Sequence, residues 1–592
     1  MMQISSILER ISLPVPVGVP GSAVPAILVG LFVALGGVLF GYDTGNINGI
    51  LAMKQFRDQF STGFTDTIDG QDNQPDFTAG QKALIVSILS AGTFFGALFA
   101  APAADKIGRR YGLMVSCVIF IVGALLQVAS STIPVFAVGR CVAGLGVGML
   151  STLVPLYQAE TWRLPQAHLC YMKLTSDHVD SAPKWIRGAI CSAFQFAVTF
   201  GLFLAAIVDN ATKNRTNSGA YRIPLAVQLA WAVILILGMI ALPETPRYLI
   251  KRDRHEDAAR SLARLRRLPM DSRYLAEIAE IAEHHEHELN LGGSSYLDCF
   301  RGSLGKRLMT GCLLQAFQQL TGINFIFYYG TSYFSSADMG DPFVITMITN
   351  SVNMLATIPG LFMIERWGRR PLLLFGGIGM AVSQFLVAGL GTGLTQSDAT
   401  NKASIVLICL FIFFYACSWG PVVWVVPGEI FSLKVRAKSM SLSTASNWLI
   451  NWALAYSVPY MVGSGTGNLN LQAKMFFIWA SFCLLATITV WCLVYETKGL
   501  SLEQVDEMYA EIDKAWESHD FQAAIALRNS QRRSVNSQAQ PWNRHSAKAP
   551  SYSVHIEASP SSTLEDTERH QSRSSRGTII EQEPTIMLRQ FP

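Results

Sequence analysis

Polar side chains able to bind a hydroxylated ligand lie within one apolar segment, at Gln318, Gln319, Asn324 and Tyr328. Each amide offers an acceptor and two donors, and the phenol both donates and accepts. Such groups are costly inside a membrane unless they are used. They match a ligand whose own hydroxyls donate and accept; the alternative is hydrogen bonding between neighbouring helices. Gly322 and Gly330 would let the helix break around such a ligand.

Two charged residues form a second candidate site. Asp43 is the only acidic residue within the first six apolar segments, and Arg140 opens the fourth. Ionisable side chains at membrane depth are usually paired, and they often take part in ion or proton movement. The residues therefore predict either a proton-coupling pair or a structural ion pair.

Long apolar segments carry these residues. Half of the 592 residues are hydrophobic and 15% are charged, which is too apolar for a soluble chain of this length. A helix needs about 20 apolar residues to cross a bilayer. The sequence therefore predicts an all-α membrane protein with twelve transmembrane helices, at 24–44, 83–103, 112–131, 134–156, 189–208, 224–242, 308–332, 343–364, 371–391, 403–426, 440–461 and 474–494.

The charges of the connections predict an orientation. Lys and Arg gather after the second and eighth segments and in 243–307. Loops with such an excess stay in the cytoplasm, so both termini are expected there, in a multi-pass plasma-membrane protein. Two glycosylation sequons, at Asn210 and Asn214, follow the fifth segment, where the connection is expected outside.

The chain repeats itself. "DKIGRR" (105–110) corresponds to "ERWGRR" (365–370), "PETPR" (243–247) to "YETKG" (495–499), and "QAE…IRG" after the fourth segment to "PGEIFSLKVRA" (427–437). Two sets of six segments thus match at three corresponding ends. Parallel six-helix repeats with a substrate site between them are a transporter architecture.

These motifs give the chain a resemblance to the sugar porter family of the major facilitator superfamily, and within it to the fungal hexose transporters. The resemblance runs from about residue 25 to 510. Its further carriers are "GYDTG" (41–45), "GRCVAGLGVG" (139–148), "PETPRYL" (243–249), "QQLTGINFIFYYG" (318–330) and "ETKGLSLEQVDEMY" (496–509).

The resemblance implies roles for further residues. The substrate-binding set gains Gln195, Asn353, Trp424, Asn447 and Trp448, the indoles offering flat faces to sugar C–H groups. In proton-coupled members the aspartate matching Asp43 pairs with the arginine matching Arg140. Exposed ion pairs, weak one at a time, would form a cytoplasmic gate from Asp105, Arg109, Arg110, Glu160, Arg187, Glu244, Arg247, Glu365, Arg369, Arg370, Glu429, Arg436 and Glu496.

Two positions depart from the family pattern. Ala416 lies where some members have an acid, so any coupling from such an acid is absent. Tyr495 lies where proline is usual, so the last segment should end less sharply.

The predicted organisation has five parts. They are a cytoplasmic segment 1–23, a six-helix half 24–242, a cytoplasmic helical linker 243–307, a second half 308–494 and a cytoplasmic tail 495–592. The tail is poor in apolar residues and should be mostly disordered after about residue 510.

One loop is longer than its counterpart. Glu160 and Arg187 are twenty-seven residues apart, whereas Glu429 and Arg436 are seven apart. Removing 162–181 restores the family's usual "QAET-APKWIRG". The segment is either a tolerated insertion, since loops absorb length cheaply, or a retained intron of the gene model, which is the favoured hypothesis.

Together these features predict transport of a monosaccharide by alternating access, with glucose as the expected hexose. Proton symport is favoured over facilitated diffusion. The alternative is a glucose sensor of transporter-like fold that signals through its cytoplasmic tail. No P-loop, metal-ligand spacing or catalytic constellation occurs in the sequence, so we expect no enzyme activity, cofactor, metal, nucleotide or nucleic acid.

Overall fold

The structure, a computed structural model, describes residues 24–68, 71–161, 185–266, 295–336, 340–393, 397–432, 435–463, 467–500, 502–525 and 527. The predicted segment 1–23, the insertion 162–181 and most of the predicted tail lie outside these residues. So does 267–294 of the linker.

The first half of the repeat is almost entirely helical. The exception is a short antiparallel hairpin of β1 (Thr65–Ile68) and β2 (Gln71–Pro75). Its helices are α2 (Val24–Val33), α3 (Leu35–Ala52), α4 (Lys54–Phe60), α5 (Ala79–Ile107), α6 (Arg109–Ala129), α7 (Ile133–Thr161), α9 (Trp185–Thr212) and α10 (Gly219–Ala241).

The second half follows a helical connection made of α11 (Pro246–Lys251), α12 (His255–Arg266) and η1 (Leu297–Phe300). Its helices are α14 (Gly302–Leu320), α15 (Ile323–Ser336), α16 (Pro342–Trp367), α17 (Arg369–Gly393), α18 (Asp398–Cys417), α19 (Trp419–Ile430), α20 (Arg436–Val462), η2 (Gln472–Lys474) and α21 (Met475–Leu493). Beyond it come α22 (Leu502–Glu511), η3 (Ala515–Glu517) and a helical turn over 518–525.

Ten helical segments of the described chain are long and apolar enough to cross a membrane. They include α2–α3 taken together and α18–α19 taken together. The two predicted spans missing from this set correspond to the α14–α15 pair and to α20, both of which are rich in buried polar residues. The all-α membrane fold is confirmed, while the count of twelve spans stays a prediction.

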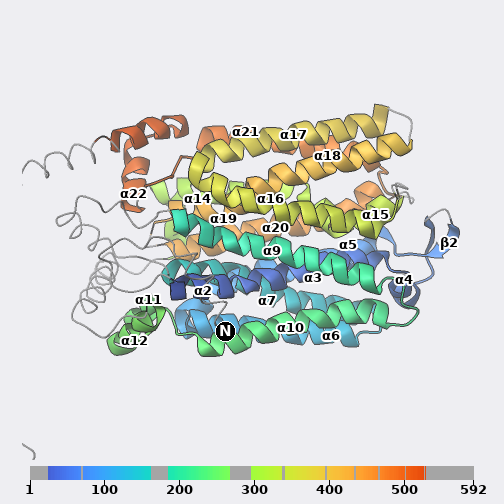
Figure 1. Ribbon diagram of the computed structural model, residues 1–592, viewed down its shortest axis with the longest axis horizontal. Helices are drawn as coiled ribbons and strands as arrows, with labels where there is room; N and C mark the ends of the chain where they lie inside the picture. The colour runs from blue at the N-terminus through green and yellow to red at the C-terminus, as the bar shows by residue number, and fades with distance from the viewer. Residues whose placement is uncertain are drawn as a thin grey trace, which may run out of the picture. The chain divides into compact units, whose positions relative to one another are not determined.

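The long helices have two distinct ends (Figure 1). At one end lie β2 and α4, and at the other lie α11, α12 and α22. We call the first the hairpin end. We call the second the motif end, because the paired sequence motifs at Arg109 and Arg369 begin α6 and α17 there.

Close packing in the first half depends on small residues. A Cβ atom added at Gly41 of α3 would collide with the backbone of Val198 on α9, and one added at Gly201 of α9 would collide with the backbone of Val38. The two helices therefore touch backbone to backbone, which small residues permit in membrane proteins.

The most extensive contacts between the two halves run along two helix pairs. In one pair α5 packs along α20, and in the other α9 packs along α16. Ser441 Oγ of α20 donates to the Ala97 carbonyl of α5 over 2.6 Å. Ser90 Oγ of α5 donates to Asn451 Oδ1 of α20 over 2.8 Å. Polar side chains hold membrane helices together in this way.

Part of the tail is helical. Within the stretch after about residue 510 that was predicted to be mostly disordered, residues 515–525 form helical turns. Buried Val505, Met508, Phe521 and Ile525 form an apolar cluster there with Tyr495. A composition average over the whole tail conceals these few apolar residues, which is why the sequence reading missed the segment.

Candidate substrate site and motif-end ion pairs

The predicted break in the seventh segment is present. The α-helix stops at Leu320 and resumes at Ile323, with Gly322 at φ +79° between them. A side chain at this glycine would be strained, and its Cβ would collide with the indole of Trp479. The amide of Gln384 donates to the freed Thr321 carbonyl over 2.8 Å, so the break costs no unsatisfied acceptor at that position.

A second break faces the first. Between α18 and α19, Pro421 has no N–H to donate to the Cys417 carbonyl, so the helical ladder is interrupted there. Gln318 Nε2 donates to the carbonyls of Trp419 (3.0 Å) and Gly420 (3.1 Å), just past this break. Gln318, one of the residues predicted to bind substrate, therefore links the α14–α15 break to the α18–α19 break.

The predicted amides form one continuous network. Gln319 Nε2 donates to Asn447 Oδ1 over 2.8 Å, and Asn447 Nδ2 donates in turn to Gln315 Oε1 (2.6 Å) and Gln318 Oε1 (3.0 Å). Asn324 Nδ2 donates to Gln319 Oε1. All are carried by α14, α15 and α20, and none carries a charge.

Asn451 extends this network into the other half. Its Nδ2 donates to Gln319 Oε1 over 3.2 Å. Its Oδ1 accepts the Tyr328 hydroxyl (3.1 Å) and the Ser90 hydroxyl of α5 (2.8 Å). A single amide thus joins the broken helix to the opposite half.

The sequence reading missed three members of the network, Gln315, Asn451 and Ser90. The signal for two of them was present, because Gln315 lies one helical turn before Gln319 and Asn451 one turn after Asn447. Ser90 had no comparable signal, since serines are common in membrane helices.

Aromatic side chains lie beside the network. Trp448 Nε1 donates to Ser151 Oγ of α7 over 3.3 Å, and its ring stands edge-on to Phe40 at 5.2 Å. Trp424 stands edge-on to Phe194 at 5.9 Å. Both indoles thus connect the second half to the first, in contacts with residues of α3, α7 and α9.

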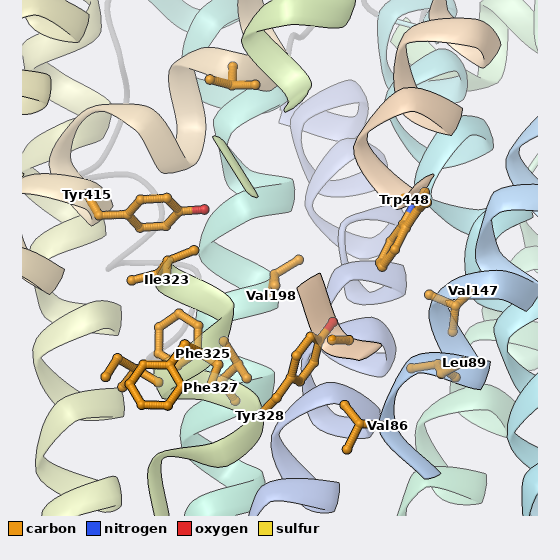
Figure 2. Close-up of a cluster of buried hydrophobic side chains, with 14 of the residues drawn as sticks. Val86, Leu89, Val147, Val198, Ile323, Phe325, Phe327, Tyr328, Tyr415 and Trp448 are labelled. Atoms are coloured by element: carbon orange, nitrogen blue, oxygen red, sulfur yellow. The ribbon is translucent and has the colours of Figure 1, made fainter. Parts of the chain in front are cut away.

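Apolar side chains from both halves surround these groups (Figure 2). The rings of Tyr415 and Trp448 lie on opposite sides of Val198 in that view, and Tyr328 lies below them. The buried residues shown with them include Val86 and Leu89 of α5, Val147 of α7 and Ile323 of α15.

Two predicted residues are less firmly connected. Gln195 of α9 is buried and lies near Gly420. A Cβ atom added at Gly420 would lie 3.4 Å from the amide nitrogen of Gln195. Asn353 of α16 is buried and its Oδ1 has no hydrogen-bond partner within the described chain. An unsatisfied buried acceptor is expensive, so Asn353 is suited to bind a further donor.

Asp43 and Arg140 form a loose ion pair. Their nearest charged atoms are 3.7 Å apart, and each side chain is only 1% exposed. Neither carboxylate oxygen of Asp43 accepts a hydrogen bond from any described residue, and Arg140 Nε and Nη2 likewise have no partner. A buried pair this poorly hydrogen-bonded is held weakly.

Each half carries the same ion-pair cluster at the motif end. In the first half, the Arg109 guanidinium lies 2.8 Å from Glu160, and Glu244 accepts the backbone N–H groups of Arg109 (3.0 Å) and Arg110 (3.1 Å). Thr245 Oγ1 donates to Glu160 over 2.7 Å. Burial raises the pKa of Glu244, and the backbone N–H groups of Thr245, Arg110 and Arg109 oppose that rise.

The second half repeats this geometry. The Arg369 guanidinium lies 2.7 Å from Glu429, Glu496 accepts the N–H groups of Arg369 (3.1 Å) and Arg370 (3.0 Å), and Thr497 Oγ1 donates to Glu429 over 2.6 Å. The predicted internal repeat is therefore also a repeat of side-chain contacts.

Other predicted gate residues lie around these clusters. Asp105 lies 3.8 Å from Arg109 and 2.9 Å from Lys251. Glu365 lies 3.2 Å from Arg369. Arg436 donates to the Gly428 carbonyl. The side chain of Arg187 lies outside the described residues, and Arg247 follows Pro246 at the start of α11.

The tail contacts the second cluster. Ser518 Oγ accepts the Glu496 N–H over 3.0 Å, and Gln522 Nε2 donates to the Glu496 carbonyl over 2.9 Å. The backbone of Glu496 is thus held by the segment that follows the last long helix. Nothing in the sequence pattern predicted this contact.

Comparisons with known proteins agree with this architecture. The family model described as "Sugar (and other) transporter" matches residues 29–509. "Major facilitator-type transporter ecdD" of Aspergillus rugulosus is 55% identical over 518 residues, which cover 86% of this chain and 91% of that protein. "Probable glucose transporter rco-3" of Neurospora crassa is 51% identical over 516 residues, which cover 86% of this chain and 83% of that protein.

Two further matches bear on fold and role. "High glucose sensor RGT2" of Saccharomyces cerevisiae is 41% identical over 82% of this chain, which spans 61% of the sensor's length. The proton:xylose symporter XylE bound to 6-bromo-6-deoxy-D-glucose superimposes with a TM-score of 0.66 at 24% identity, over 82% of this chain and 100% of that chain. The last match shows a shared fold. The chain therefore belongs to the sugar transporter family, within the major facilitator superfamily.

Proposed function

We propose that this chain carries a monosaccharide, with glucose as the expected hexose, across a membrane by alternating access. The observation that carries the proposal is the uncharged amide network at the α14–α15 break. It offers donors and acceptors from both halves at one place, through Gln319 and Asn451 of the second half and Ser90 of the first. A sugar hydroxyl can replace an amide–amide bond without leaving either amide unsatisfied.

The two breaks supply the movement such a cycle needs. The α14–α15 and α18–α19 junctions have fewer helical hydrogen bonds than the helix interiors, so α15 and α19 can tilt at modest cost. Binding energy from the sugar would then favour states in which both halves contact it. A shift of a few kcal/mol is enough to exchange the populations of two such states.

The orientation is part of the same proposal. The motif end is assigned to the cytoplasm, with both termini, and the hairpin end to the outside of the plasma membrane. The Lys and Arg residues at the motif end support this assignment. Glu160 with Arg109, and Glu429 with Arg369, would then act as the cytoplasmic gate proposed from the sequence.

Uptake measurements test the transport proposal. In cells that lack hexose transporters, expression of this chain is expected to restore uptake of labelled glucose. Absence of uptake from cells that carry the protein at their surface would exclude transport of glucose. Competition by unlabelled galactose, fructose and xylose then ranks the substrates.

Proton coupling is expected to depend on Asp43. Its loose pairing with Arg140 leaves the carboxylate free to exchange partners. Uptake should fall when a protonophore is added, and Asp43→Asn should abolish that sensitivity while facilitated uptake persists. Uptake by the unsubstituted protein that does not respond to the protonophore would show facilitated diffusion instead.

Glycosylation is expected at Asn214 and not at Asn210. The sequence reading placed both in a loop, but Asn210 lies within α9, where the hydroxyl of its sequon residue Thr212 is bonded to the Val208 carbonyl over 3.0 Å. Asn214 is exposed beyond the end of α9. Digestion with a glycosidase should shift the mobility of wild type and Asn210→Gln. The same treatment should leave Asn214→Gln unchanged, and a shift of Asn214→Gln would contradict the assignment.

A glucose sensor is the second candidate. Its support is the contact of Ser518 and Gln522 with the backbone of Glu496, which links the tail to the gate, together with the similarity to "High glucose sensor RGT2". A chain that binds glucose at the cell surface, restores no uptake and alters transcription through its tail would establish this function.

The insertion hypothesis stays a prediction. Residues 162–181 fall between Glu160 and Arg187 in the sequence. Transcripts that uniformly contain these codons would refute the retained-intron explanation.

A further inference from the structure

A buried carboxylate near the hairpin end has no assigned role. Asp209 of α9 is 2% exposed, and its Oδ1 has no hydrogen-bond partner among the described residues. It belongs to no ion pair in that part of the chain. The sequence reading overlooked it because the fifth apolar segment was ended at residue 208, whereas α9 continues to Thr212.

The surroundings of Asp209 explain how it is accommodated. A Cβ atom added at Gly49 of α3 would collide with the Asp209 carboxylate, so the carboxylate lies directly against bare backbone. The neighbouring Tyr42 hydroxyl is already engaged, because it donates to the Pro224 carbonyl over 3.1 Å. A carboxylate so placed is expensive unless a cation can reach it.

A lysine lies one helical turn further along. The Lys213 N–H donates to the Asp209 carbonyl over 2.9 Å, so the helical geometry continues through Lys213 and the two side chains share a helix face. The Lys213 ammonium nevertheless points elsewhere. It lies 3.0 and 2.7 Å from the two carboxylate oxygens of Asp341, and 4.9 Å from the centre of the Phe343 ring.

Asp341 belongs to the opposite half. It caps α16, accepting the Phe343 N–H over 3.0 Å. Burial raises its pKa, but the hydrogen bond and charge of Lys213, together with the N–H groups of Phe343 and Val344, outweigh this and leave the pKa lowered. Beside this ion pair, Asn48 Oδ1 of α3 accepts the Thr331 N–H of α15 over 3.0 Å. Both contacts join the halves, so both must break when the halves separate at the hairpin end.

We propose that Lys213 is a shared counter-ion of two carboxylates, pairing with Asp341 when the hairpin end is closed and with Asp209 when it is open. In the closed arrangement Asp341 holds the lysine and Asp209 is left alone. Opening moves Asp341 away with its half and frees the ammonium for Asp209 within its own helix. Asp209 therefore stabilises the open state, and Asp341 the closed state, through the same side chain.

The proposal rests on alternating access and on the hairpin end facing outward, but its test does not require sugar uptake. A cysteine at position 331 (Thr331→Cys), fully buried in the closed arrangement, would react with a membrane-impermeant maleimide only when the hairpin end opens. Labelling is compared with the parent chain lacking that cysteine, on full-length protein at the cell surface.

Exposed ion pairs contribute about 0.2–1 kcal/mol, so each change should shift the labelling rate by about 1.4- to fivefold. Asp341→Asn removes a contact of the closed state alone, so it is expected to raise the labelling rate. Lys213→Ala also takes away the partner that Asp209 would gain in the open state, so it is expected to raise the labelling rate less. Asp209→Asn is expected to lower it. In a Lys213→Ala background, Asp209→Asn should have no further effect.

A matched control is Lys82→Ala. It removes an ion pair of 2.6 Å with Asp76, also at the hairpin end but within one half, and should leave labelling unchanged. The proposal is overturned if Asp209→Asn changes labelling equally with and without Lys213, or if Asp341→Asn does not raise labelling. If the expected labelling pattern is found in a chain that takes up no sugar, the exchange of Lys213 between Asp341 and Asp209 is supported and only the transport proposal is rejected.

Discussion

Replacing Gln319 by alanine is expected to lower the Vmax/KM of sugar uptake by about 10- to 100-fold. Its amide bonds to Asn447 over 2.8 Å and accepts from Asn451 over 3.2 Å and from Asn324. Loss of the side chain leaves Asn447 Oδ1, Asn451 Nδ2 and Asn324 Nδ2 without this hydrogen-bond partner. Each unsatisfied buried group costs about 1–3 kcal/mol, and 1.4 kcal/mol corresponds to a tenfold change in affinity.

The measurement is initial uptake of labelled glucose, normalised to surface protein. Gln81→Ala is a matched control, since Gln81 is a glutamine engaged only in a helix cap at the hairpin end, with Thr78 and Thr62. Uptake by that variant should match wild type. Normal uptake by Gln319→Ala at normal surface level would place the sugar site elsewhere.

Replacing Arg369 by alanine is expected to destabilise the second half by about 3–5 kcal/mol. Arg369 is 4% exposed, and its guanidinium binds Glu429 (2.7 Å), Glu365 (3.2 Å) and the Ile364 carbonyl (3.3 Å). Its removal leaves two carboxylates facing each other with no cation between them. The thermal unfolding midpoint of the purified protein in detergent should fall, and uptake should fall with it.

The matched control is Arg366→Ala, three residues earlier in the last turn of α16 but exposed. It should change stability by less than about 0.5 kcal/mol. Arg369→Lys should be intermediate, because lysine keeps the charge but cannot reach Glu429 and Glu365 with a planar fork. If Arg369→Ala and Arg366→Ala behaved alike, the cluster would contribute nothing to the fold.

The repeat sharpens this expectation. Arg109 holds Glu160 at 2.8 Å in the corresponding position of the first half. Arg109→Ala should therefore cost about as much as Arg369→Ala. Unequal costs would show that one motif-end cluster stabilises the fold more than the other. The described part of the tail contacts the cluster that contains Glu496.

Several features of this protein can be predicted from the local sequence alone. Membrane helices follow from local composition, because about 20 apolar residues are enough to specify a span. The amide-rich segment at Gln318 and the motif pairs at Arg109 and Arg369 could also be identified from residue type and order. The family membership that these motifs predicted is confirmed by the match of the sugar transporter family model to residues 29–509.

The residues at which helices end were less predictable from the sequence than the presence of the helices. Hydropathy falls wherever polar residues begin, whereas the helix ends only where its hydrogen bonds end. Asp209 and Asn210 were therefore placed outside a helix that includes both. The same effect concealed the helical turns at 515–525 of the tail, whose few apolar residues matter only because they meet Tyr495.

The sequence alone determined the class of protein. It is a membrane protein of the sugar transporter family, with several spans, two matching halves and an uncharged segment rich in amide side chains. Only the tertiary structure determined which polar groups meet, because partners such as Ser90 and Asn451, or Lys213 and Asp341, lie far apart in the chain. Hydrogen bonds and ion pairs are short-ranged, so their pairing depends on how helices pack rather than on their order in the chain.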